Sequence, residues 1–353
     1  MEGGKNDLQI GFIDFINSLI SSPIMLITVL LTLGVIFVNG WTDAPNAIAT
    51  CVCTGALKMK KAIILSAVFN FLGAVIMGII NTKVAQTIYT MVDFGSSSES
   101  VAALCAAMLA IIAWATGAWW FGIPTSESHA LIAGIGGAAI AISGFKALDP
   151  QGWLKVLNGI VLSVAIGFIL GYIFAKAIKI IIPDCENKHT FYKNAQIVGA
   201  AAMSFMHGAQ DCQKFVGVMI LGIGLNSGQD PERFSVIPIW LMLLCSVVIS
   251  LGTALGGGRI IKAVGKDMVA LESYQGFCAD IAGAISLFLS SVLGLPVSTT
   301  HAKTTAIMGT GAAKSKAEVN WKIAFEMITA WFLTFPGCMI VGFITAKLFM
   351  LII

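Results

Sequence analysis

The stretch Asn39-Gly-Trp-Thr-Asp-Ala-Pro-Asn46 returns in the second half of the chain as His207-Gly-Ala-Gln-Asp-Cys-Gln-Lys214. A second pair follows the same plan, because Gly122-Ile-Pro-Thr-Ser-Glu-Ser-His129 matches Gly294-Leu-Pro-Val-Ser-Thr-Thr-His301 at nearly the same offset. All four segments place helix-breaking or ionisable residues inside apolar sequence. Membrane proteins built from inverted repeats surround a central polar site with broken helices of this kind. The repeats therefore predict a two-fold-like structure with its polar site at the centre.

The composition indicates a membrane protein. Of the 353 residues, 57% are hydrophobic and 11% are charged, whereas soluble domains carry about 25% charged residues. We expect an all-α polytopic membrane protein, an inverted-topology repeat with broken or re-entrant helices and about ten to twelve membrane segments. The net charge of +3 is too small to favour binding to nucleic acid.

The most polar link of the chain, residues 183–194, falls between the two copies. It divides the chain into a first repeat over residues 1–186 and a second, inverted repeat over residues 187–353. The first repeat is predicted to open with an amphipathic helix near residues 10–20, lying at the membrane interface.

The short apolar pieces that begin at the motifs decide the topology. We expect residues 43–56 and 211–225 to turn back on the side they entered, and residues 125–142 and 296–313 to cross. Each half then crosses the membrane an odd number of times, which inverts the second half relative to the first.

One face of the membrane then holds most of the basic residues, and the positive-inside rule makes that face cytoplasmic. Both chain termini are predicted outside the cell, in a multi-pass protein of the inner or plasma membrane. The predicted cytoplasmic basic residues are Lys58, Lys60, Lys61, Lys176, Lys179, Lys188, Lys193, Arg259, Lys262, Lys266, Lys314, Lys316 and Lys322.

The first motif predicts a cation site. A carboxylate at bilayer depth is costly unless it is paired or bound to a cation, and Asp43 recurs as Asp211 in the other half. Oxygen donors suit a hard cation such as sodium. An alternative is that both carboxylates only cap helices at the membrane interface. The predicted sodium ligands are Asp43, Asn46, Gln210 and Asp211, with Ser126 and Ser298 as further candidates.

The second motif predicts an anion site. Pro124 and Pro296 end one segment, and Ser126 and Ser298 then stand as caps of new helices. The free N–H groups and the dipole at a helix start attract a small oxyanion such as phosphate. Ordinary capping without a ligand is the alternative. The predicted substrate-binding residues are Thr125, Ser126, Ser128, Gln275, Ser298, Thr299 and Thr300.

Other ionisable groups lie beside these motifs. Glu127, His129 and His301 are candidates for proton coupling, although a histidine in such a position is commonly a hydrogen-bonded structural residue. Lys214 and Lys303 either neutralise an aspartate, attract an anion or reach the membrane interface. The spacing matches no recognised catalytic metal pattern, so we expect neither an enzyme nor a bound cofactor.

The two motifs resemble the signatures of a known family. Gly40-Trp-Thr-Asp-Ala-Pro-Asn-Ala47 is similar to the Gly-Ala-Asn-Asp-x-x-Asn-Ala signature of the inorganic phosphate transporter (PiT) family, and Gly294-Leu-Pro-Val-Ser-Thr-Thr-His301 matches that family's second signature. The chain departs from the signatures in both copies. Thr42 and Gln210 replace an asparagine, Lys214 replaces the second asparagine, and Ser126-Glu-Ser-His129 replaces Ser-Thr-Thr-His.

The resemblance implies an inverted-repeat symporter that imports inorganic phosphate with sodium or protons, and it implies a homodimer. The aspartate of the first signature would bind the coupling cation, and the hydroxyl-rich second signature would contact phosphate or cation. Four alternatives stay open: sulfate or another oxyanion carried by the same fold, proton coupling, a passive channel, and a membrane enzyme that uses the two histidines.

Overall fold

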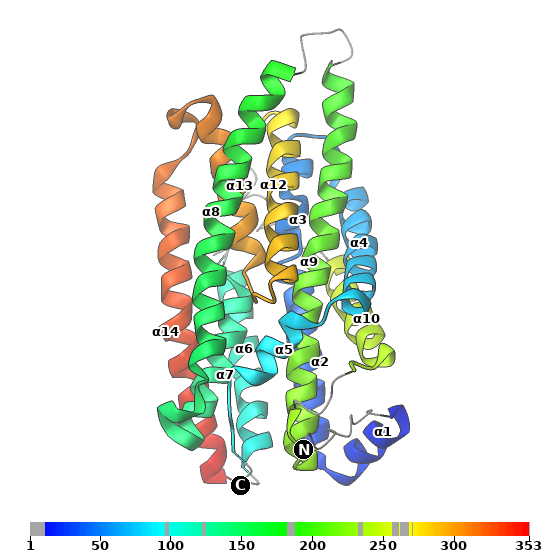
Figure 1. Cartoon of the computed structure of the whole chain (residues 1–353), viewed down its shortest axis with the longest axis vertical. Helices are drawn as coiled ribbons and strands as arrows, with labels where there is room; N and C mark the ends of the chain where they lie inside the picture. The colour runs from blue at the N-terminus through cyan, green and yellow to red at the C-terminus, as the bar shows by residue number, and fades with distance from the viewer. Residues whose placement is uncertain are drawn as a thin grey trace, which may run out of the picture.

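The chain folds into a bundle of long α-helices (Figure 1). The computed structural model describes residues 11–95, 99–121, 125–181, 188–231, 236–255, 261, 268–269 and 271–352. The first half contains α1 (Phe12–Ser21), α2 (Pro23–Thr42), α3 (Pro45–Cys53), α4 (Met59–Ile80), α5 (Lys83–Thr90), α6 (Ser100–Trp120), α7 (Glu127–Ser143) and α8 (Pro150–Ile181). The second half contains α9 (Lys188–Ser227), α10 (Ile239–Leu255), α12 (Ser273–Val292), α13 (Thr299–Lys314) and α14 (Trp321–Ile352).

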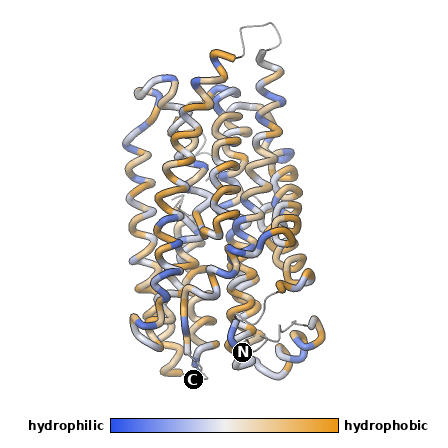
Figure 2. The backbone as a smooth tube through the Cα atoms, viewed as in Figure 1, coloured by the Kyte–Doolittle hydropathy of each residue, from blue (hydrophilic) through white to orange (hydrophobic). Residues whose placement is uncertain are grey.

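The helices have the length and apolar surface of membrane spans. Among the described residues, seven helical stretches are long and apolar enough to cross a membrane. Apolar residues cover the bundle along most of its height (Figure 2), and large exposed side chains such as Ile64, Val161 and Phe332 point outward. With α9, α10 and α13 also in the bundle, the predicted polytopic all-α class is confirmed, and the expected number of segments agrees with it.

The two halves have the same order of elements and opposite directions (Figure 1). In the first half, α2–α3 and α8 cross in one direction, and α6 and α7 form a hairpin that enters from the end where both chain termini lie. In the second half, α9 and α14 cross the opposite way, and α12 and α13 form the matching hairpin from the other end. The inverted topology is therefore present. The expected repeat boundary at residue 186 lies outside the described residues.

The re-entrant pieces are not the ones expected from the sequence. Residues Pro23–Cys53 form one nearly continuous 31-residue span, and Lys188–Ser227 is a single helix, so the pieces after the first motif continue forward. Asp43 and Ala44 keep helical backbone angles, and a proline is tolerated in the first turn of α3. A helix break without a change of backbone direction does not reverse the chain.

The hairpins form at the second motif instead. The Trp41 and Trp119 ring centroids are 4.6 Å apart, so α6 ends at the level of the α2–α3 break. After α12, Gly294 adopts a φ of 70° and residues 295–298 are non-helical before α13 begins. These few extended residues reverse the chain inside the bundle, which a shallow kink cannot do.

Each half still crosses an odd number of times, so the described basic residues near the start of α4 and the ends of α8 and α13 remain together. The start of α4 and the ends of α8 and α13 lie at the end of the bundle opposite both termini (Figure 1). The orientation of that end toward the cytoplasm stays a prediction.

Close helix crossings join the two halves at matching glycines. A Cβ added at Gly208 of α9 would lie 2.1 Å from the Asn70 carbonyl oxygen of α4, and one added at Gly40 of α2 would lie 2.1 Å from the Ile249 oxygen of α10. Small residues allow backbones to approach closely in membrane bundles. These crossings hold α2–α3 and α9 against the opposite half.

We expect Gly208→Ala to destabilise the bundle by about 1–3 kcal/mol, the usual cost of overpacking. Its matched control is Gly117→Ala, because a Cβ at Gly117 meets nothing within 4 Å and a helical alanine is intrinsically favoured over glycine. Thermal unfolding in detergent should show a lower midpoint for the first variant only. Equal midpoints for the two variants would contradict the close crossing.

Candidate functional site

Two helix starts meet in the middle of the bundle. The Ser126 hydroxyl accepts from the His129 N–H at 3.2 Å, and the Ser298 hydroxyl accepts from the His301 N–H at 3.2 Å. Both predicted caps are therefore confirmed. The two histidine ring centroids are 4.4 Å apart, so the first turns of α7 and α13 are in contact. Their positive dipole ends converge from opposite directions, which favours an anion between them.

Asp43 lies beside the start of α13. Its Oδ1 accepts hydrogen bonds from Thr300 Oγ1 and, at 2.8 Å, from Asn46 Nδ2, while its Oδ2 accepts from Thr299 Oγ1 at 3.0 Å. Asp43 is 1% exposed and forms no ion pair within the described residues. The Asn46 Oδ1 atom is buried and lacks a hydrogen-bond partner there. A buried carboxylate with only neutral donors favours a nearby cation.

Asp211 occupies the matching place in α9 and has different partners. Its Oδ1 pairs with Lys214 Nζ at 2.6 Å, and its Oδ2 accepts from Asn39 Nδ2 at 3.1 Å. His207 Nε2 lies 3.4 Å from the same Oδ2. Of the three alternatives for Lys214, the structure shows pairing with an aspartate, Asp211, whose two oxygens are both engaged.

The two carboxylates face each other across the break in α2–α3. One oxygen of Asp43, one oxygen of Asp211 and one ring nitrogen of His207 lie within 4.8 Å of one another. Two acidic groups this close are stable in an apolar interior only with positive charge between or beside them. His207 belongs to the first motif, but its place beside the two carboxylates was not predicted from the sequence.

Further predicted residues of the two motifs lie around this centre, of which Gln210, Glu127 and Ser128 are buried and Thr125 is half-buried. Gln210 donates to the Leu295 carbonyl at 2.7 Å and accepts from Ser291 Oγ at 2.6 Å, so it braces the turn before α13. Glu127 accepts from Thr42 Oγ1 at 3.2 Å. Ser128 contacts Lys214, and Thr125 directly precedes the Ser126 cap.

His129 and His301 lie on a different side of the helix starts. His301 stacks on Trp331 at 3.8 Å between ring centroids, and His129 packs on Phe335 at 4.6 Å. None of their ring nitrogens has a hydrogen-bond partner within the described residues. Both rings line an apolar cavity of about 1150 Å³. This packing places the rings against aromatic side chains, while their role in proton coupling stays a prediction.

Gln275 is not brought to the site. Its Oε1 accepts from the Glu272 N–H at 2.9 Å, its Nε2 donates to the Thr310 carbonyl at 3.3 Å, and with Glu272 it forms a capping box at the start of α12. The site adjoins the other end of α12, about 24 Å away at 1.5 Å per residue between Gln275 and Ser291. The Glu-x-x-Gln spacing was the signal for a cap.

A second buried ion pair lies beyond the start of α13. Lys303 Nζ contacts Asp280 Oδ1 and, at 3.1 Å, Thr50 Oγ1, which itself donates to Asp280 Oδ1 at 2.7 Å. Asp280 Oδ2 has no partner within the described residues. Sequence reasoning noted Lys303 but missed Asp280, although a lone aspartate in an apolar helix marks a polar partner.

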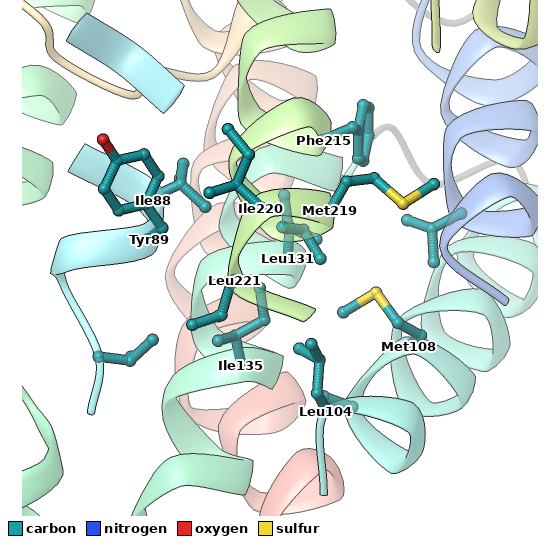
Figure 3. Packing of buried hydrophobic residues seen from close by; sticks show 14 of the residues in the cluster. Ile88, Tyr89, Leu104, Met108, Leu131, Ile135, Phe215, Met219, Ile220 and Leu221 are labelled. Carbon is teal, nitrogen blue, oxygen red and sulfur yellow. The ribbon is translucent and has the colours of Figure 1, made fainter. Parts of the chain in front are cut away.

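On the opposite side of the site the packing is apolar. Side chains from α5, α6, α7 and α9 form a continuous buried cluster in this region (Figure 3). The labelled members are Ile88, Tyr89, Leu104, Met108, Leu131, Ile135, Phe215, Met219, Ile220 and Leu221. The site is therefore closed at this end by hydrophobic contacts.

Two inverted sets of spans around converging helix starts define a multi-pass membrane protein with the inverted-repeat architecture seen in transporters. The model of the phosphate transporter family matches this chain twice, over residues 39–190 and 183–342. The chain belongs to that family, as its resemblance to the PiT signatures predicted. The family and its relatives are transporters and not enzymes.

Similar proteins agree with this assignment. A probable low-affinity inorganic phosphate transporter of Bacillus subtilis (strain 168) is 39% identical over 319 residues, covering 89% of this chain and 94% of the relative. One of the same description from Rhizobium meliloti (strain 1021) is 37% identical, covering 87% and 90%. A solved structure titled the sodium-dependent phosphate transporter has a TM-score of 0.85 at 23% identity, covering 94% of this chain and 100% of that one. At this identity the structural match supports the fold.

We expect Lys303→Met to destabilise the protein by about 3–5 kcal/mol, because it leaves the Asp280 carboxylate buried without its partner. The double variant Asp280→Asn with Lys303→Met should recover much of that loss, since no charge remains. The measurement is thermal unfolding in detergent across the full double-mutant cycle. Additive effects of the two substitutions would mean that the pair does not interact in the folded protein.

Proposed function

We propose that this protein imports inorganic phosphate across the cell membrane by alternating access, together with sodium. The observation that carries the proposal is the environment of Asp43. A buried carboxylate with neutral donors and an unpartnered Asn46 oxygen lies directly beside two converging helix starts. A cation bound beside Asp43 offsets the charge of an anion held at the two helix starts.

Sodium fits the oxygen atoms around Asp43. The Asp43 carboxylate, Asn46 Oδ1 and the hydroxyls of Thr299 and Thr300 are hard oxygen donors within one cluster. The two hydroxyls can turn their lone pairs toward a cation by releasing their bonds to Asp43. Sodium and its ligands would then tie α3 to α13, which belong to opposite halves.

Phosphate fits the helix starts. Backbone N–H groups at α7 and α13 favour negative charge, and each capping serine keeps its own O–H to donate. Glu127, in the first turn of α7, is a buried acceptor beside these donors. A phosphate that retains a proton can donate to such acceptors, whereas sulfate at neutral pH cannot. This chemistry, like the names of the relatives, favours phosphate over sulfate.

Alternating access needs two closed ends that open in turn. The predicted sidedness places the Lys-rich end of α4, α8 and α13 in the cytoplasm and both termini outside. Binding of sodium and phosphate together lowers the net charge of the buried site. The closed state is therefore favoured most when both are bound.

Uptake of radiolabelled phosphate into proteoliposomes tests the proposal. A sodium gradient should drive accumulation, a proton gradient alone should not, and excess sulfate should leave the rate unchanged. Uptake driven by protons alone would overturn sodium coupling and direct attention to Glu127. Sulfate transport without phosphate transport would overturn the substrate.

We expect Asp43→Asn to lower sodium-driven uptake by at least about tenfold, because losing one charged interaction of about 1.5–3 kcal/mol changes binding by that factor. The matched control is Asp14→Asn, the same substitution on exposed α1, which should transport normally. The sodium dependence of the initial rate is measured for both variants. An unchanged sodium dependence in Asp43→Asn would remove Asp43 from the cation site.

A further inference from the structure

Among the positions at which the two copies of the first motif differ, one links the two halves of the site and changes its charge. Asn46 and Lys214 are equivalent when the two halves are aligned on the first motif, and Ser128 and Thr300 are equivalent when they are aligned on the second. The structure preserves both correspondences. Each residue of the first pair bridges the aspartate of its own half to the hydroxyl of the opposite half.

In the first half the bridge is neutral. Asn46 Nδ2 lies 2.8 Å from Asp43 Oδ1 and 3.0 Å from Thr300 Oγ1. The amide supplies no positive charge, and its own oxygen is left without a partner within the described residues. The carboxylate of this half therefore still needs a cation from outside the chain.

In the second half the bridge is itself a cation. Lys214 Nζ lies 2.6 Å from Asp211 Oδ1, 2.5 Å from Ser128 Oγ and 2.6 Å from the Val297 carbonyl oxygen. A carboxylate, a hydroxyl and a backbone carbonyl at a helix break are the oxygen types that hold sodium in inverted-repeat transporters. The ammonium group occupies the centre of that set.

Little remains for a mobile ion to bind at Asp211. Its second oxygen already contacts Asn39 and His207, and Lys214 is 1% exposed and fixed by three contacts. Removing such an ammonium would leave a buried unpaired carboxylate, which is strongly unfavourable.

We propose that the Lys214 ammonium is a tethered substitute for a second sodium ion, so that the Asp211 half of the site takes no sodium. Residue 214 thereby sets the number of sodium ions that accompany each phosphate. This inference rests on the proposed function, because it assumes that the Asp43 half takes sodium.

The decisive variant is Lys214→Asn, which rebuilds the second half on the pattern of the first. Equilibrium binding of ²²Na⁺ to purified protein should rise by one ion per chain relative to the wild type. In proteoliposomes the ratio of ²²Na⁺ to ³²P-phosphate should rise equally, and the Hill coefficient for sodium should increase from about 1 to about 2. Lys214→Arg keeps the positive charge and should retain the wild-type count.

The mirror variant makes the test independent of the folding of Lys214→Asn. Asn46→Lys places a tethered ammonium beside Asp43, so sodium binding should fall by one ion per chain and phosphate binding should lose its sodium dependence. Gel filtration identifies the variants that fold.

Two results would overturn the inference: a folded Lys214→Asn protein that binds no more sodium than the wild type, or a folded Asn46→Lys protein that binds as much. Failure of the proposed function gives a different result, because wild-type proteoliposomes would then accumulate no phosphate under a sodium gradient. The count of sodium bound to the purified variants would still decide the role of residue 214.

Discussion

The arrangement depends on two helix N-termini that meet in the interior of the bundle. A helix start leaves backbone N–H groups without partners, and such groups are costly where water is absent. Ser126 and Ser298 satisfy one of these groups at each start. The remaining donors and the positive ends of the two converging dipoles produce a positive potential at one point. The paired carboxylates, the buried Lys214 and the inverted course of the chain are arranged around that potential.

The sequence predicts this centre because its chemistry is local. A proline followed two residues later by serine favours a helix start, and both serines cap as predicted. The course of the chain between the motifs is less local. Asp43-Ala-Pro45 and Gly294-Leu-Pro296 each place a proline in apolar sequence, yet only the second reverses direction, because Gly294 takes a positive φ and an extended stretch follows.

A single sequence also does not specify which polar side chains pair between different helices. Lys303 and Asp280 belong to different helices, so no helical spacing relates them, and only the packing of α12 on α13 brings them together. For Gln275 the sequence predicts a contact that the structure does not show. A polar side chain in an apolar helix predicts a ligand there. Its partners are the backbone of its own first turn and the Thr310 carbonyl.

Alignment of the two halves on their motifs also reveals why the two ends of the site are not equivalent. Lys303, Thr50 and Asp280 then correspond to Leu131, Val218 and Met108. One end is thus lined by polar side chains, including the unpartnered Asp280 Oδ2, and the other by buried apolar residues. Water entering the polar end gains hydrogen bonds, whereas water entering the apolar end only separates packed surfaces. An inverted repeat with identical halves would give inward-open and outward-open states of equal free energy. These three differences between the halves remove that equality, so under the proposed alternating access the polar end would be the less costly one to open.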